Sequence, residues 1–340
     1  MTSDDLLRHH GDVDAAPGLI DFAVNVRGGR PPTWLRRRLA EALDRLGSYP
    51  AAADDRRARE AVAARHGREP DEVLILNGSA EGFALLPALA PTQAALVHPS
   101  FTEPEVALRT ARVPVRRVLL SPDDDFALHP ADVPPEADLV VLGNPTNPTS
   151  TLHPADAIRE LAERATVLVD EAFMDAIPGE PESLAADRNP NLLVFRSLTK
   201  TWALPGLRAG YAIGHPDLLA RLACHRPQWP VGTLALEAVV ACCEPPALAE
   251  AELAAVEARD HRRVLQAALG PLVLGDPRAP FLLIEVEDGP GLRQALRDKG
   301  IAVRRGDTFP GLGPNHIRIA VRSPEECAPL LAALALEVHP

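Results

Sequence analysis

Short apolar runs recur through the first two thirds of the chain, and each of them ends in small or polar residues. The runs are VLIL before NGSAE, AALV before HPSF, DLVVLG before NPTNP, TVLV before DEAF and LLVF before RSLTK. Apolar residues at helical spacing occupy 33–46, 55–65 and 154–164. Wholly apolar strands that alternate with helices predict a mainly parallel sheet covered by helices on both faces. The polar clusters are then expected at the carboxyl ends of the strands, where open α/β sheets bind ligands.

The pattern changes after Cys242. A long stretch rich in alanine, glutamate and arginine, about 246–269, has helical spacing and precedes the strand-like run FLLIEVE. A helix over 291–299, the runs IAVR and HIRIAVR, and a helix over 324–336 follow. We therefore expect three segments: an N-terminal arm on the substrate side at 1–30, a large domain at 31–240 and a small C-terminal domain at 241–340.

Composition and charge exclude several classes of protein. The chain has 340 residues, of which 46 % are apolar, and a net charge of -12 at pH 7. A general nucleic-acid-binding protein needs a basic face, so this charge argues against one. No apolar run approaches the roughly 18 residues that span a bilayer, and the first residues, MTSDDLLRHHGD, lack the apolar core of a signal peptide. The four cysteines have no metal-type spacing, so we expect free thiols, no metal site and a cytoplasmic protein.

One lysine stands out in FRSLTKTWALPGLRAGY, because the chain is poor in lysine and rich in arginine. In a partly dry site Lys200 can lose its proton and form an imine with a carbonyl, whereas an arginine stays charged. Pyridoxal phosphate is the common aldehyde partner of such a lysine, and its ring nitrogen requires a carboxylate. Asp170, in VLVDEAF, follows a predicted strand and can supply that carboxylate.

The other groups of this cofactor also have candidate partners after the predicted strands. Asn147, in NPTNP, can donate to the phenolic oxygen, and Phe101, in HPSFTEP, can cover the ring. A phosphate group requires hydroxyls, an arginine and backbone N–H groups at a helix start. The candidates for the phosphate are Ser79, Ala80, Ser197, Thr199 and Arg208. Each motif alone is weak, because such residues commonly form turns and caps, and it is their order along the chain that indicates a site.

The order of these motifs along the chain resembles that of the fold-type I pyridoxal-phosphate enzymes. The motifs that carry the resemblance are NGSAEG, NPTNP, DEAF, SLTKTWALPGLRAG and IRIAV. The resemblance is to the branch that holds histidinol-phosphate aminotransferase and the threonine-phosphate decarboxylase of cobalamin biosynthesis. It covers roughly residues 20 to 335. It implies an aspartate-aminotransferase-like α/β fold, with a mainly parallel sheet between helices and a smaller α/β C-terminal domain. It also implies that Lys200 is the Schiff-base lysine and that Asp170 meets the pyridinium nitrogen.

The resemblance reaches beyond the cofactor. Tyr49, in SYP, matches a tyrosine that reaches the cofactor phosphate of the neighbouring subunit, which implies a homodimer. Arg318, in HIRIAVR, matches an arginine that binds an acidic group of the substrate.

Some residues distinguish this chain within the branch. Phe173, in DEAF, stands where many relatives have a tyrosine whose hydroxyl donates to the phenolic oxygen. This phenylalanine, and Arg322 after IRIAV, resemble the decarboxylase side of the branch. So do His10 and Asn25 in the N-terminal stretch, and we expect these residues on the substrate side together with Arg318. Two further arginines, Arg304 and Arg305, are either surface charges or anion ligands.

Two activities therefore fit the sequence. The first is decarboxylation of a small phosphorylated amino acid, with threonine phosphate as the expected substrate. The alternative is an aminotransferase of the histidinol-phosphate type, in which Lys200 removes the Cα proton and a keto acid completes the cycle. A non-catalytic cofactor-binding protein is a remote alternative, because the full set of lysine, aspartate, asparagine and arginine is present. A nucleotide-dependent dehydrogenase is disfavoured, since no strand is followed by GxGxxG.

Overall fold

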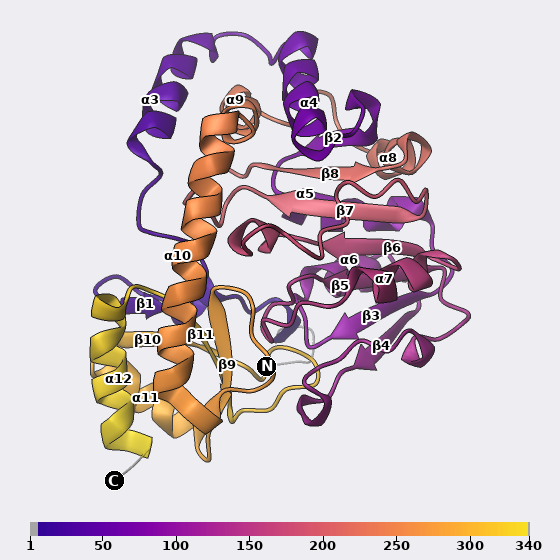
Figure 1. Ribbon diagram of the computed structural model, residues 1–340. Helices are drawn as coiled ribbons and strands as arrows, with labels where there is room; N and C mark the ends of the chain where they lie inside the picture. Colours follow the sequence, from indigo (N-terminus) through magenta and orange to yellow (C-terminus); the bar gives the residue numbers. More distant parts are fainter. Residues whose placement is uncertain (1–5, 339–340) are drawn as a thin grey trace.

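The computed structural model describes residues 6–338, which fold around a seven-stranded and a four-stranded sheet (Figure 1). The large sheet has the order β2 (Val73–Leu76), β8 (Gly210–Gly214), β7 (Leu192–Ser197), β6 (Thr166–Asp170), β5 (Leu139–Gly143), β3 (Ala94–His98) and β4 (Val115–Leu119). Strand β8 is antiparallel to both of its neighbours, and the other pairs are parallel. The predicted α/β fold with a mainly parallel sheet is therefore confirmed.

Helices cover both faces of the large sheet, and the strand residues alternate between them. Val167 and Val169 of β6 belong to one apolar cluster, while Leu168 between them belongs to the cluster on the opposite face. The first cluster includes side chains of α3 (Thr33–Glu41), α4 (Ala52–His66), α7 (Ala155–Ala162) and α9 (Thr233–Cys242). The second includes side chains of α5 (Ser79–Leu85), α6 (Glu103–Thr110) and α8 (Pro216–Ala223). Burial on both faces explains why these strands are apolar throughout.

The small sheet lies at the far end of a long helix, α10 (Pro245–Leu269), which appears in orange in Figure 1. Its strand order is β1 (Ile20–Phe22), β10 (Ile301–Arg305), β11 (His316–Ala320) and β9 (Phe281–Glu285). The helices α11 (Gly289–Asp298) and α12 (Pro324–Val338) share its apolar cluster. Strand β1 comes from the segment that we expected to be an N-terminal arm, and it pairs in parallel with β10. Phe22 of β1 is fully buried in the cluster of the small sheet.

The remaining helices are short. They are α2 (Gly11–Asp14), and the 3-10 helices η1 (Ala42–Arg45), η2 (Pro70–Glu72), η3 (Leu86–Leu89), η4 (Pro122–Asp124), η5 (Pro130–Asp132), η6 (Met174–Ala176) and η7 (Gly270–Leu272). The helix expected over 33–46 is thus divided, because α3 ends at Glu41 and the chain continues as η1. Ala42 is buried in this last turn, whereas Leu43 and Leu46 are 52 % and 53 % exposed, so few core contacts favour continuation of the α-helix.

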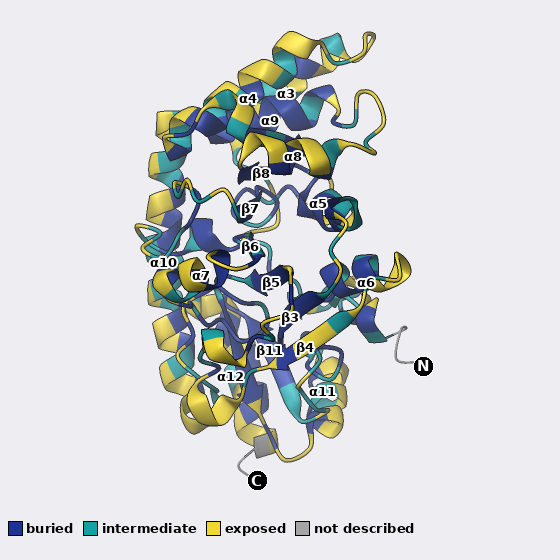
Figure 2. Cartoon of the chain, turned by 90° about the vertical axis from the view of Figure 1, so that its right-hand side faces the viewer, coloured by how far each residue is buried: buried dark blue, intermediate teal, exposed yellow. Residues whose placement is uncertain are grey.

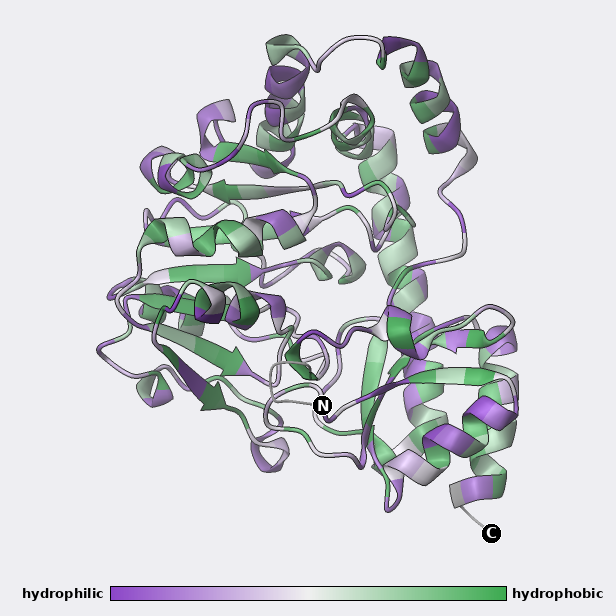
Figure 3. Ribbon diagram, turned by 180° about the vertical axis from the view of Figure 1, so that it is seen from behind, coloured by the Kyte–Doolittle hydropathy of each residue, from purple (hydrophilic) through white to green (hydrophobic). Residues whose placement is uncertain are grey.

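Burial and hydropathy show the same layered arrangement. Figure 2 shows the strands of the large sheet mainly in the buried colour, and Figure 3 shows most of them in the hydrophobic colours. Edge strand β4 is the exception, since Arg116 and Arg117 of its sequence VRRVL are exposed. None of the helices within residues 6–338 has both the length and the apolar character that crossing a membrane requires.

Candidate active site

A cavity of about 330 Å³ lies at the carboxyl ends of the central strands of the large sheet. The predicted site residues that line it are His10, Asn25, Ser79, Ala80, Phe101, Asn147, Asp170, Phe173, Ser197, Thr199, Lys200, Arg208 and Arg318. They come from the ends of β3, β5, β6 and β7, from the start of α5 and from the small sheet. Parallel strands end at the same edge, so motifs that are far apart in the sequence meet here.

Lys200 follows β7 by three residues and lies in this cavity. Burial, with a smaller contribution from the charge of Arg318, lowers the pKa of Lys200 to about 8, although the carboxylate of Asp170 acts in the opposite direction. Its Nζ lies 5.6 Å from the centre of the Phe173 ring. An amine in these surroundings is partly neutral near pH 8 and can act as a nucleophile or as a base.

Asp170 is the last residue of β6, beside Lys200 in the same cavity. Burial raises the pKa of Asp170 to about 7, although a hydrogen bond from the backbone N–H of Ala172, 3.2 Å away, lowers it. The charge of Lys200 also lowers the pKa of Asp170, but it does not outweigh burial, so the ionised carboxyl group is only partly compensated. A protonated ring nitrogen would supply a further cation, so Asp170 fits a pyridinium partner.

The expected phosphate side of the cavity contains hydroxyls and an arginine. Ser197 Oγ and Thr199 Oγ1 are 2.8 Å apart, and Ser79 lies beside them at the start of α5. Arg208 Nη1 donates to the carbonyl of Pro205, and within residues 6–338 no carboxylate pairs with its guanidinium. Gly78 has φ 75°, and a Cβ there would come within 2.9 Å of Arg208 Nη2. The positive φ of Gly78 favours glycine at this position, and the cluster fits an anionic group.

Arg318 and Asn147 are hydrogen-bonded to each other in the wall of the cavity. Arg318 Nη1 donates to Asn147 Oδ1 over 2.6 Å, which leaves the amide N–H₂ of Asn147 free to donate to another group. The guanidinium of Arg318 also donates to the carbonyl of Ala23. Burial and the charge of Arg304 lower the pKa of Arg318 to about 9. A buried arginine without an ion-paired carboxylate in the described residues fits an acidic group of a ligand.

Two further predicted residues complete the wall of the cavity near the N-terminal segment. The side chain of Asn25 is buried, and neither its Oδ1 nor its Nδ2 has a hydrogen-bond partner within residues 6–338. Buried amides are rarely left unpaired, so Asn25 fits a residue whose partner belongs to a ligand. His10 Nε2 lies 2.6 Å from Glu103 Oε1, and the His10 ring is 5.2 Å from that of Phe101.

Two predicted residues lie outside this cavity. The side chain of Tyr49 is 74 % exposed and stacks on Trp229 with ring centres 4.3 Å apart. Arg322 lines a neighbouring cavity of about 700 Å³, and its guanidinium donates to the backbone carbonyls of Asp21 and Val24. These bonds tie the strand β1 segment to the end of β11.

The structure also places a residue in the cavity wall that the sequence left undecided. Arg304, the fourth residue of β10, is only 2 % exposed and lines the cavity, whereas Arg305 points elsewhere and pairs with Asp307. Arg304 Nη1 lies 3.0 Å from Asp14 Oδ2, and its guanidinium lies 5.0 Å from the centre of the Phe309 ring. Side chains of neighbouring residues on a strand point to opposite faces of the sheet. The sequence of β10 could therefore have predicted that only one of the two arginines faces the cavity.

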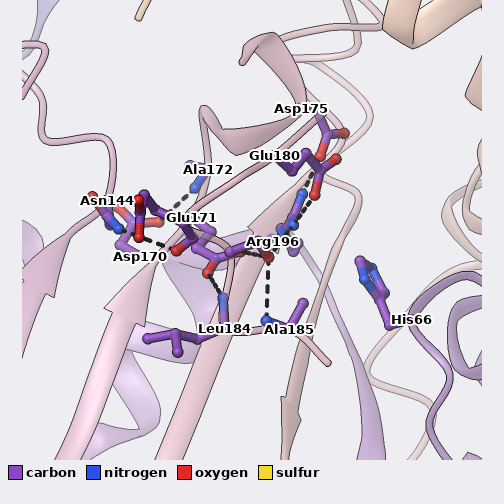
Figure 4. A network of polar contacts seen from close by, with 12 residues as sticks. His66, Asn144, Asp170, Glu171, Ala172, Asp175, Glu180, Leu184, Ala185 and Arg196 are labelled. Atoms are coloured by element: carbon purple, nitrogen blue, oxygen red, sulfur yellow. Dashed lines mark hydrogen bonds and ion pairs between the residues drawn. The ribbon is translucent and has the colours of Figure 1, made fainter. Parts of the chain in front are cut away.

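A buried ionic network begins at Glu171, the residue after Asp170 (Figure 4). Arg196 of β7 is 1 % exposed and pairs with Glu171, Asp175 and Glu180. Arg65 of α4 pairs with the last two of these carboxylates at 3.0 and 2.9 Å. These ion pairs connect β7 and α4 to the turn that follows Asp170 and contains Phe173.

Comparisons with known proteins point to one family. Residues 17–334 match the family described as aminotransferase class I and II. A histidinol-phosphate aminotransferase of Mycobacterium tuberculosis is 54 % identical over 96 % of this chain and 90 % of its own length. The threonine-phosphate decarboxylase of Salmonella typhimurium is 32 % identical over 93 % of this chain and 90 % of its own. The crystal structure of an aminotransferase from Mycobacterium tuberculosis superimposes with a TM-score of 0.84 at 23 % identity, covering 99 % of this chain and 94 % of that one.

Proposed function

The chain belongs to the class I and II aminotransferases, pyridoxal-phosphate enzymes, and on that premise we propose that it transfers the amino group of histidinol phosphate to a keto acid. The choice of histidinol phosphate as the substrate rests on the 54 % identity with proteins named histidinol-phosphate aminotransferases. The match to a threonine-phosphate decarboxylase is weaker, at 32 %. The comparisons thus favour the alternative activity over decarboxylation, which the sequence motifs had put first.

The residues of the cavity fit pyridoxal phosphate group by group. Asp170 would hold the ring nitrogen and Asn147 the phenolic oxygen, while Phe101 would cover one face of the ring. The phosphate would be held by backbone and side-chain groups of Ser79, Ala80, Ser197, Thr199 and Arg208. When bound, this cofactor supplies an aldehyde that takes up an amino group and a ring that withdraws electrons from the adjacent carbon.

Four residues of the chain would act on the substrate or contact it. Lys200 Nζ, with its pKa lowered to about 8, would take the proton from the substrate carbon that bears the amino group and deliver it to the aldehyde carbon of the cofactor, and would move a proton in the opposite direction when the keto acid reacts. Arg318 would bind the acidic group of the substrate, the phosphate of histidinol phosphate or the carboxylate of the keto acid. The unpaired amide of Asn25 would hydrogen-bond to the same ligand, with His10 beside it.

Amino transfer is tested directly with the purified holoenzyme. Incubation with histidinol phosphate and 2-oxoglutarate should yield glutamate in amounts that match the histidinol phosphate consumed. A parallel incubation with threonine phosphate should release no carbon dioxide above background. Carbon dioxide release from threonine phosphate, without glutamate formation from histidinol phosphate, would contradict the proposal.

Decarboxylation of threonine phosphate is kept as a second candidate because of one observation at the site. Phe173 lines the cavity close to Lys200, where many relatives have a tyrosine, and this form resembles the decarboxylase side of the branch. In that reaction Asp170 keeps its place at the ring nitrogen, and Lys200 returns a proton to the carbon that has lost its carboxylate. The carbon dioxide assay above decides between the two activities.

We also propose that the working unit is a homodimer, in which Tyr49 of one protomer reaches the cofactor phosphate of its partner. The support is the exposure of Tyr49 and of the Trp229 ring stacked on it, 74 % and 54 %. Leu43 and Leu46 are exposed on the same segment. Aromatic and aliphatic groups exposed together are typical of protein–protein interfaces.

A further inference from the structure

A chain of three polar side chains ends at the cavity and has no part in the function proposed above. Ser100, two residues after β3, lines the cavity, and its Oγ lies 3.3 Å from Nδ1 of His98. His98 Nε2 lies 3.0 Å from Oε2 of Glu105, in the first turn of α6. His98 and Glu105 are both fully buried.

The charge of Glu105 is fixed by its neighbours. Arg109 Nε and Arg117 Nη2 donate to Glu105 Oε1 over 2.5 and 2.7 Å. Although burial opposes ionisation, hydrogen bonds from His98, Arg117 and Arg109 lower the pKa of Glu105 to about 2. Burial also lowers the pKa of His98, against the opposite effect of Glu105, and the two arginine charges add to the lowering. A neutral imidazole beside an ionised carboxylate follows from this arrangement.

The ionised carboxylate determines which nitrogen of His98 carries the proton. A carboxylate only accepts hydrogen bonds, so Nε2 of His98 must be the N–H that donates to Glu105. Nδ1 then has a free lone pair and accepts the hydroxyl proton of Ser100. Ser100 Oγ has no other hydrogen-bond partner within residues 6–338. Ser100 Oγ can therefore accept a further hydrogen bond but has no proton left to donate.

We propose that Ser100 accepts a hydrogen bond from an N–H or O–H group of the substrate, and that His98 and Glu105 are positioning residues that keep it an acceptor. Ser100 then differs from the pair of Ser197 and Thr199, in which one hydroxyl donates to the other and the second hydroxyl is free to donate to a phosphate. Anionic oxygens are disfavoured next to Ser100, whereas a donor is favoured. This inference rests on the proposed function, under which the donor is the imidazole N–H of histidinol phosphate.

The first test is a comparison of two substrates in two enzymes. The thiazole analogue of histidinol phosphate replaces the imidazole N–H with sulfur at nearly the same size. The wild-type holoenzyme should prefer the imidazole substrate in kcat/KM, and Ser100→Ala should reduce that preference by about tenfold or more, the size expected when a buried donor loses its acceptor. Ser100→Thr retains the hydroxyl and should restore the preference. An unchanged preference in Ser100→Ala would overturn the proposal.

The second test reads the tautomer and does not depend on turnover. In holoenzyme labelled with ¹⁵N-histidine, the resonances of His98 are identified by their loss in His98→Gln. Their shifts should show a protonated Nε2 and an unprotonated Nδ1. A protonated Nδ1 in an active enzyme would overturn this inference but not the proposed function, because Ser100 would then be free to donate. If the tautomer is as expected but the enzyme transfers no amino group from histidinol phosphate, the result would count against the proposed function and not against the role of His98.

Discussion

Lys200 owes its reactivity to its surroundings, since burial and the charge of Arg318 lower its pKa to about 8. The neutral amine is the nucleophile, so covalent adduct formation between apoprotein and pyridoxal phosphate should accelerate with rising pH and level off above about 8. An ordinary lysine would level off only near 10.4. Stopped-flow absorbance over pH 6–10 measures this profile.

The chain contains its own control for this experiment, because Lys299 is its only other lysine. Lys299 is partly exposed, pairs with Glu337 over 2.6 Å and does not line the cavity. Lys299→Ala should keep the profile and the borohydride-stable adduct, whereas Lys200→Ala should lose both. An adduct that persists in Lys200→Ala would remove Lys200 from its proposed role.

Asp170 is a carboxyl group whose pKa burial raises to about 7. A cationic ring nitrogen would stabilise its ionised form, and the carboxylate would in turn keep that nitrogen protonated. Asp170→Ala and the nearly isosteric Asp170→Asn should therefore bind the cofactor but lose several orders of magnitude in kcat. Cofactor content by absorbance and kcat by glutamate formation separate the two effects, and near-normal kcat in either variant would contradict the role.

At the scale of elements, the turn between β6 and η6 depends on one buried guanidinium. Arg196 faces three carboxylates, of which Glu171 and Asp175 are also buried. Arg196→Met would leave the buried Glu171 without its ionic partner and would leave Arg65 as the partner of the other two carboxylates, so the free energy of unfolding should fall by about 3–5 kcal/mol. Urea denaturation measures the loss. Arg56→Ala, which removes an exposed pair with Glu60 over 2.8 Å, should change it by no more than about 0.5 kcal/mol.

The elements also show what the sequence could predict and what it could not. The apolar runs that became β2, β3, β5, β6 and β7 are recognisable because both of their faces are buried, and their following motifs meet in the cavity. Strands β1, β4 and β8 were not recognised: β1 is only three residues long, and β4 is an edge strand with exposed arginines. Ser100 lies within HPSFTEP, but the motif does not indicate its contact with His98, which depends on side-chain packing.

At the scale of the whole molecule, the cavity lies between the two sheets. Lys200 and Asp170 come from the large sheet, whereas Arg318 and Arg304 come from β11 and β10 of the small one. Asn25 belongs to the segment that leads from β1 in the small sheet to α3 on the large one. The proposed cofactor and substrate contacts would thus be divided between the sheets, and a ligand that binds both would couple them. Tyr49 remains outside the cavity of its own protomer, on an exposed part of the chain.

If Tyr49 acts on the cofactor phosphate of the partner, two inactive variants should restore activity when their subunits mix. In a heterodimer of Lys200→Ala and Tyr49→Ala, the Tyr49→Ala protomer keeps its lysine and receives an intact tyrosine from its partner. Random exchange makes half of the dimers mixed, each with one complete site, so about a quarter of wild-type activity should return. Glutamate formation after refolding an equimolar mixture measures this. Lys200→Ala mixed with Asp170→Ala should recover nothing, because both residues serve the same protomer's cavity. Absence of recovery in the first mixture, with both variants dimeric, would place Tyr49 outside the site.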